Sequence, residues 1–180
     1  MLIFTVHDQS MQQKSIAFLF FIPFWLFSFA WEQVEISPNV SVAFPKKPEK
    51  KIIDGKEIWI AELDSTVKMF VVITDFEKQG VGAKEMAELL KKAKTYTDLK
   101  NGFVLGAGNA VALKDSICTF KGKPAYYLKM DMRGEKEDLN KSQLMNVFVG
   151  AKMYGLWFLE KNGTSHEAEK LRFWNSLAIK

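Results

Sequence analysis

Residues 67–76 read VKMFVVITDF, and this segment decides the fold of the chain. Successive side chains of a strand alternate between the two faces of a sheet. The apolar residues here fall on both faces, with Met69, Val71 and Ile73 on one and Phe70 and Val72 on the other. A strand that is apolar on both faces lies inside its sheet and is covered from both sides. We therefore expect this segment in the middle of the core.

The sequence before this segment predicts antiparallel strands. Four are expected, over residues 31–36, 40–44, 51–53 and 57–63. Asp54-Gly55 is a strong hairpin signal, because both central positions of the favoured tight turn need a positive φ, which Asp and Gly tolerate. Pro45 ends the second strand by removing a backbone donor. The segment from Lys46 to Lys51 is polar and is expected at the surface.

The period changes after Gly82. Five residues, Met86, Leu89, Leu90, Ala93 and Tyr96, fall on one side of a helix over residues 83–96. This spacing predicts an amphipathic helix that lies on the sheet, and the turn residues from Asp98 to Gly102 are expected to end it.

The sequence after Gly102 returns to strand patterns. Strands are expected over residues 103–105, 110–113, 117–120, 125–133, 143–149 and 154–159. Thr164 and Glu167 have the spacing of a capping box, in which two side chains satisfy backbone donors at a helix start. A second helix is therefore expected to begin here and to end the chain. The whole pattern predicts an α+β protein, an α/β/α sandwich with a mostly antiparallel central sheet and two main helices.

The first thirty residues resemble an export signal. Lys14 precedes an apolar core over residues 16–27, and Ser28-Phe29-Ala30 supplies small residues for a signal peptidase. We expect cleavage after Ala30 and an exported, periplasmic or extracellular domain over residues 31–180 that meets the membrane only through its leader. An uncleaved anchor is the alternative, although a membrane span needs about 20 apolar residues. Met11 is a better start than Met1, because His7 and Asp8 are unusual in a basic leader.

Charge and cysteine content exclude two classes of protein. The net charge is +4, and the lysines are spread among many acids, so a nucleic-acid partner is not expected. Cys118 is the single cysteine, which excludes a disulfide framework. The domain must therefore be held together by its core.

Three short segments resemble the PsbP-like family of small exported proteins. They are Val42-Ala43-Phe44-Pro45, Gly122 followed by Ala125-Tyr126-Tyr127, and the run over residues 173–177, FWNSL. The resemblance spans nearly the whole domain and implies an α/β/α sandwich that acts as a binding or assembly module, without a shared catalytic apparatus. It supplies no site residues, and a fold of this kind hosts unrelated functions.

Catalytic, metal and cofactor sites are weakly indicated. Cys118 and His166 are the nucleophile and base that a thiol-dependent or other hydrolase would use, and this is the alternative to a non-catalytic domain. The glycines over residues 104–110 lack the third small residue and the following helix of a dinucleotide fingerprint, so a turn between two strands is expected there. The acids over 135–138 lack a calcium-loop pattern. No metal, cofactor or catalytic residue is predicted.

An excess of apolar residues on neighbouring strands is the remaining feature. Met130, Met132, Tyr126, Tyr154 and Trp157 are the candidates, with Met145, Met153 and Phe158 close by in the sequence pattern. They form either core beneath two helices or a groove lined by adaptable methionines. We therefore expect a non-catalytic exported domain that binds a partner protein of the cell envelope or an apolar ligand.

Overall fold

The computed structural model describes residues 31–108, 110–132 and 139–180. The predicted leader, its cut after Ala30, the start at Met11 and the acids over 135–138 lie outside the described residues. Seven antiparallel strands form the large sheet, in the order β3-β4-β5-β9-β8-β7-β6. Their bounds are β3 Glu49–Ile53, β4 Lys56–Asp64, β5 Val67–Asp75, β6 Val111–Phe120, β7 Lys123–Asp131, β8 Lys141–Val149 and β9 Lys152–Glu160.

A separate three-stranded sheet lies beside the large one. It consists of β1 Glu32–Ser37, β2 Val40–Phe44 and β10 Ala178–Ile179, in the order β1-β2-β10. The helices are η1 Glu77–Gln79, α1 Ala83–Leu89, α2 Ala93–Gly106 and α3 Glu167–Asn175. Within the described residues, no helix is long and apolar enough to span a membrane.

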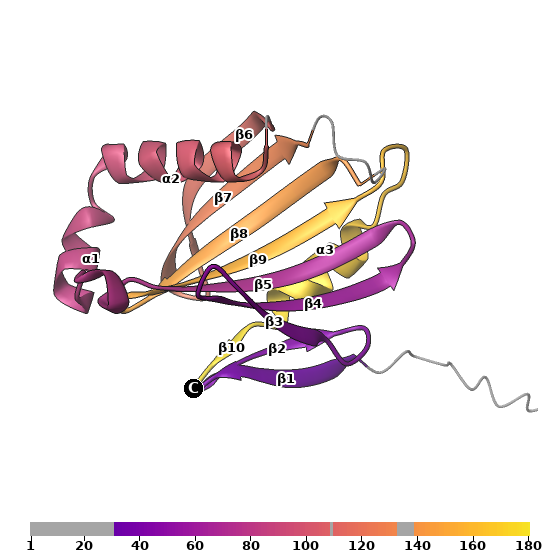
Figure 1. Ribbon diagram of the computed structural model, residues 1–180, viewed down its shortest axis with the longest axis horizontal. Helices are drawn as coiled ribbons and strands as arrows, with labels where there is room; N and C mark the ends of the chain where they lie inside the picture. Colours follow the sequence, from indigo (N-terminus) through magenta and orange to yellow (C-terminus); the bar gives the residue numbers. More distant parts are fainter. Residues whose placement is uncertain (1–30, 109, 133–138) are drawn as a thin grey trace, which may run out of the picture.

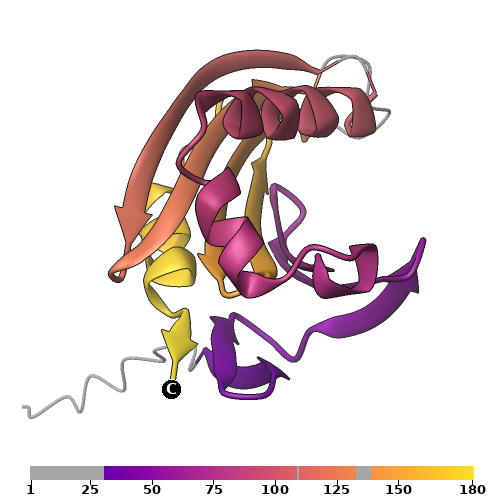
Figure 2. The same cartoon turned by 90° about the vertical axis from the view of Figure 1, so that its left-hand side faces the viewer.

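The helices cover opposite faces of the large sheet. Figure 1 shows α2 in front of the sheet and α3 behind it, and Figure 2 shows the same arrangement from the side. One core lies between the sheet, α3 and the small sheet, and a second lies between the sheet, α1 and α2. The predicted α/β/α sandwich is therefore confirmed.

β5 lies inside the large sheet, between β4 and β9, as predicted. Its side chains toward α3 are fully buried at Val67, Met69 and Val71. Phe70 and Val72, on the α2 side, are only partly buried. The expected cover on both faces is thus complete on one face only. The hairpin before it is confirmed, because Asp54 has φ 49° and Gly55 has φ 73°.

The predicted end of the first helical region is wrong. The helix breaks after Leu89 and resumes as α2, which continues through residues 98–102 and through the expected strand 103–105. Thr95 Oγ1 donates to Leu89 O at 2.6 Å and Tyr96 OH to Leu90 O at 2.9 Å, so side chains satisfy the carbonyls at the break. Apolar contacts of Leu99 and Phe103 with the sheet outweigh the low helix propensity of Gly102.

The two expected strands over 110–113 and 117–120 form one strand, β6. Its register against β7 shifts between Ala112 and Lys114. A bulge of this kind changes which face successive side chains occupy, so the alternation in the sequence was broken although the strand continues.

The predicted capping box and the helical C-terminus are also wrong. Thr164 Oγ1 donates to Lys161 O at 2.7 Å, and Glu167 pairs with Lys170 instead of capping the helix. Beyond α3, residues 178–179 form β10, which pairs with β2. The chain therefore ends in a strand of the small sheet.

Candidate functional site

The face of the large sheet toward α3 is closed. Phe173 of α3 is fully buried, and its ring lies 5.6 Å from that of Phe44 in β2. Trp174 Nε1 donates to Leu156 O at 3.2 Å. Helix and small sheet together cover this face, so it forms the structural core.

The opposite face carries an apolar groove of about 790 Å³. α2 packs against β6 and β7, which leaves the helix-side faces of β4, β5 and β9 without full cover. The apolar lining includes Ile58, Val72, Leu99, Phe103, Met153 and Trp157. The ring centroids of Phe103 and Trp157 lie 5.7 Å apart, edge to face, and hold one wall of the groove. A cavity of this size and lining suits a small apolar molecule.

A row of residues across four strands forms part of the floor of the groove. Ile58, Val72, Gly155 and Asn146 are successive neighbours in the register of β4, β5, β9 and β8. Gly155 has no side chain, and Asn146 Oδ1 and Trp157 Nε1 pack over it, 3.1 Å and 3.2 Å from where a Cβ would lie. Gly102 on α2 also lines the groove, and a Cβ there would meet no atom within 4 Å. Gly102 therefore leaves open space on the helix side of the groove.

Asn146 is the polar residue of this row, and its side chain is fully buried. Asn146 Nδ2 donates to Tyr126 O at 3.4 Å. No described residue donates to Asn146 Oδ1. Buried polar atoms are nearly always paired, so an unpaired acceptor at the floor of an apolar groove marks this position as a candidate for function.

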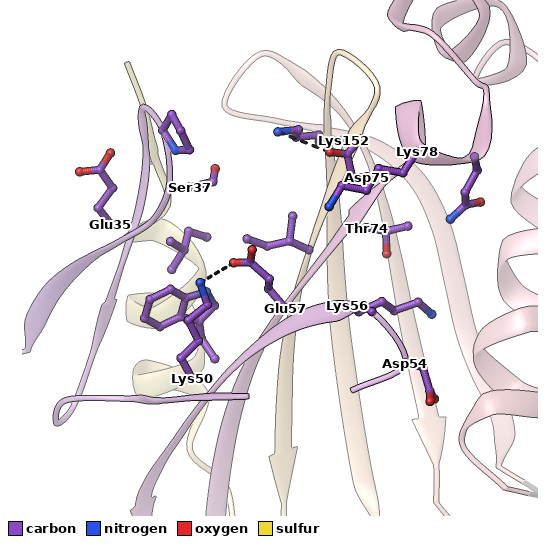
Figure 3. Close-up of a pocket in the computed structure, with 16 residues that line it drawn as sticks. Glu35, Ser37, Lys50, Asp54, Lys56, Glu57, Thr74, Asp75, Lys78 and Lys152 are labelled. Atoms are coloured by element: carbon purple, nitrogen blue, oxygen red, sulfur yellow. Dashed lines mark ion pairs between the residues drawn. The ribbon is translucent and has the colours of Figure 1, made fainter. Parts of the chain in front are cut away.

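A second, charged cleft of about 560 Å³ adjoins the groove (Figure 3). It lies between the β1–β2 turn and the ends of β4 and β5, and Asp54, Lys56, Thr74 and Gln79 line both spaces. Lys50 Nζ lies 2.8 Å from Glu57 Oε2, and Lys152 Nζ lies 3.7 Å from Asp75 Oδ2. Its lysines, Lys50, Lys56, Lys78 and Lys152, are matched by the carboxylates Glu35, Asp54, Glu57 and Asp75. This balance gives the cleft no net attraction for a charged ligand.

The structure divides the apolar candidates between the two faces of the sheet. Tyr126, Met130 and Met132 belong to the core under α1 and α2 and are buried. Tyr154 lies on the α3 side, where its OH is 2.8 Å from Ser37 Oγ. Met145 and Phe158 lie with Tyr154, whereas Met153 lies with Trp157.

Among the five candidates, Trp157 lines the groove. Val72, Asn146 and Gly155 were missed by the sequence reasoning. One signal was available. Asn146 interrupts the apolar run LMNVFV in β8, on the face of the sheet toward α1 and α2.

Cys118 and His166 are not brought together. Cys118 lies on β6, the edge strand, and burial raises the pKa of its thiol. His166 Nε2 lies 3.1 Å from Thr66 Oγ1, beside the start of β5. Four inter-strand spacings, each about 4.8 Å, separate β5 from β6. A nucleophile and its base must be within hydrogen-bond reach, so this arrangement does not form a dyad.

Two further kinds of site were considered in the sequence, a dinucleotide fingerprint and a metal site. Gly106 ends α2 and Gly108 has φ 55°, so the glycines connect a helix to a strand rather than two strands. A dinucleotide fingerprint needs the reverse order, strand then helix. In the described part of the chain, no group of three His, Cys, Asp or Glu side chains is placed to hold a metal ion.

Comparison with known proteins supports the fold. No protein-family model matches the sequence, and no curated protein matches it. The solution structure of cyanobacterial PsbP (CyanoP) from Synechocystis sp. PCC 6803 is similar to this chain, with a TM-score of 0.55 and 10% identity over 83% of this chain and 92% of that one.

A crystal structure from Bacteroides thetaiotaomicron VPI-5482 matches with a TM-score of 0.36 and 12% identity, over 79% of this chain and 45% of that one. At this TM-score it carries no weight. The likeness to CyanoP concerns the fold, because the identity is low. The chain therefore has a PsbP-like fold, as the three short segments in its sequence predicted.

Proposed function

We propose that this chain is a non-catalytic binding protein that holds a small apolar molecule in the groove between α2 and the large sheet. The groove itself carries the proposal, because apolar side chains of two helices and several strands line about 790 Å³ of space, whereas the face toward α3 is closed. Concave apolar sites with a few polar groups are the usual form of a ligand site.

The lining gives no support to catalysis. Its titratable side chains are Asp54, Lys56 and Asp98, and all three are exposed at the rim. Thr74 and Thr95 supply hydroxyls, but Thr95 Oγ1 already donates to Leu89 O, and the carboxylate of Asp98 is paired with Lys94. Binding without chemistry is the function that this set of side chains serves.

The site of action follows from the leader. Residues 16–30 have the pattern of a cleaved export signal, and the described domain begins directly after it, with β1 at Glu32. We propose that the domain works in the cell envelope or outside the cell. N-terminal sequencing of the exported protein tests this, and retention of Ile16 would contradict it.

A pair of substitutions on α2 tests the groove. Gly102→Leu places a side chain into open space at the groove, whereas Asn101→Leu adds the same side chain at a position outside the groove. Both variants keep or improve helix propensity, so both are expected to fold. The full chain is titrated with Nile red, a neutral apolar fluorophore.

We expect Gly102→Leu to weaken Nile red binding about fivefold or more, equivalent to about 1 kcal/mol. Asn101→Leu should bind like the unaltered chain. Equal binding by the two variants, or no binding by the unaltered chain, would overturn the proposal.

The exposed edge of the sheet favours a partner protein as a second candidate. β6 is an edge strand, and its side chains Val111, Leu113 and Ile117 are 39%, 56% and 58% exposed. Edge strands with exposed apolar residues pair with extended segments of other proteins. Pull-down with Leu113→Lys as the control tests this: a partner lost with that variant would support the β6 edge, and a partner retained would exclude it.

A further inference from the structure

We propose that the molecule bound in the groove is a single-chain amphiphile with a zwitterionic head. Its tail occupies the groove, and its head lies where the groove meets the charged cleft, beside Thr74, Lys56 and Asp54. This rests on the proposed function, because the tail occupies the same groove, and it adds the chemical class of the ligand. Three observations carry it: two spaces that join, a nearly buried hydroxyl without a partner, and two opposite charges without partners at the junction.

The groove and the cleft join in a polar strip. Four residues line both spaces, and all four are polar: Asp54, Lys56, Thr74 and Gln79. On one side of this strip, the groove is lined mainly by apolar side chains of β4, β5, β9 and α2. On the other side, the cleft is lined by lysines and carboxylates. A molecule that fills both spaces therefore has an apolar part and a polar part, which is the definition of an amphiphile.

Thr74, near the end of β5, supplies a hydroxyl at the junction. The residue is only 8% exposed, and its Oγ1 forms no hydrogen bond with another described residue. Asn146 Oδ1 is sealed from the groove, whereas Thr74 Oγ1 keeps accessible surface. Polar groups this deeply buried are nearly always paired, and a hydroxyl can donate one hydrogen bond. An oxygen of the ligand head supplies the acceptor that Thr74 lacks.

Lys56 and Asp54 supply opposite charges beside this hydroxyl. Among the described residues neither forms an ion pair, whereas Lys50 and Lys152 in the same cleft are both paired. Figure 3 shows Thr74, Lys56 and Asp54 in succession between the end of β5 and the β3–β4 turn. A negative group beside Thr74 and Lys56, joined to a positive group beside Asp54, matches both charges. Such a head has no net charge, in agreement with the balanced charge of the cleft.

Three amphiphiles with the same dodecyl chain test the inference: dodecylphosphocholine, dodecyl phosphate and dodecyltrimethylammonium. They present the zwitterion, its negative half and its positive half. Displacement of Nile red from the full chain is measured with each probe below its micelle concentration. We expect dodecylphosphocholine to bind about threefold or more tightly than either of the others, because it alone meets both Lys56 and Asp54, and an exposed charge pair changes affinity by up to about fivefold.

Substitutions at the junction assign the two halves of the head. Lys56→Gln should weaken the two phosphate-bearing probes about threefold but not dodecyltrimethylammonium, and Asp54→Asn should weaken dodecylphosphocholine and dodecyltrimethylammonium but not dodecyl phosphate. Asn tolerates the positive φ at position 54, so this variant keeps the turn. Thr74→Val removes the hydroxyl and should weaken the phosphate-bearing probes about fivefold. Lys47→Gln removes a lysine that lines neither space, and it should change no affinity.

The order of the three probes on the unaltered chain is measured without any variant, so it remains decisive if a variant fails to fold. Equal binding of the three probes, with Nile red displaced, would overturn the zwitterionic head but leave the proposed function standing. Equal effects of Lys56→Gln and Lys47→Gln would do the same. Failure of Nile red and all three amphiphiles to bind would overturn both proposals.

Discussion

Two buried polar residues of β8, Gln143 and Asn146, lie on opposite faces of the large sheet and differ in their pairing. On the α3 face, Gln143 Oε1 accepts from Tyr127 OH at 3.0 Å and from Lys170 Nζ at 2.9 Å, so even a buried lysine is paired. On the α2 face, Asn146 Oδ1 on the same strand has no donor among the described residues. An unpaired buried group costs about 1–3 kcal/mol. Trp59 Nε1, on the α3 face, is also unpaired, so the two faces differ in how completely they are covered rather than in polar pairing alone.

The elements that pack on the large sheet explain why one face is closed and the other is partly open. α3 and the small sheet cover their face together, and the aromatic residues Phe44, Phe173 and Trp174 fill the space between them. α1 and α2 cover the other face only in part, and they leave the groove over β4, β5 and β9. Incomplete cover is therefore the structural origin of the candidate site.

A phenylalanine from each face gives the largest expected difference. Phe173→Ala removes a fully buried ring from the closed face and should cost about 3–5 kcal/mol of unfolding free energy. Phe103→Ala removes a partly buried ring from the groove wall and should cost about 1–2 kcal/mol. Urea denaturation measures both. Equal losses would show that the two faces contribute alike to stability, against the comparison drawn above.

Substitution of the lysine at the β6–β7 turn should lower the free energy of unfolding by an intermediate amount. Lys121 Nζ donates to Asn175 O and Leu177 O, each at 2.6 Å, and so satisfies carbonyls at the end of α3. Lys121→Met should cost about 1–2 kcal/mol, whereas Lys123→Met on the same hairpin should cost less than about 0.5 kcal/mol. Equal costs in urea denaturation would show that the contact does not help to close the α3 face.

A buried tyrosine on each face should make the free energy of unfolding fall at alkaline pH, and the expected difference between the two faces is smaller here. Burial, then the hydrogen bond to Asp115, raises the pKa of Tyr126 far above its ordinary value of 10.0. Burial, then Glu167, raises the pKa of Tyr127 on the α3 face. A raised folded-state pKa means that stability is full below the unfolded-state pKa and falls as pH rises above about 10, because the unfolded chain ionises first.

We expect Tyr126→Phe to remove part of this alkaline loss. Relative to the unaltered chain, the variant should gain about 1 kcal/mol between about pH 8 and about pH 11. Tyr127→Phe should change in the same direction by less. Denaturant titrations at the two pH values measure the difference, and stability curves for Tyr126→Phe that run parallel to those of the unaltered chain would contradict the assignment.

Local patterns predicted much of the fold. Alternation identified β5 and β7, two apolar runs identified β8 and β9, and the Asp54-Gly55 turn identified the β3–β4 hairpin, because each signal depends on neighbours in the sequence. The errors occur where tertiary packing overrides a local signal. α2 continues through Gly102 because the sheet receives its apolar side, and β6 appeared as two strands because a bulge shifts its alternation.

No local sequence pattern identified the groove. Trp157 was a candidate from its apolar neighbours, but Tyr154 from the same set lies on the other face.

The sequence by itself determined the α+β class, the sandwich and the succession of most strands along the chain, since periodicity and turn residues act over a few positions. Only the tertiary structure decided which face is left open. The groove depends on strand order, on where α2 crosses the sheet and on the meeting of Gly155 with Asn146 across β9 and β8, and these are contacts between residues distant in the chain.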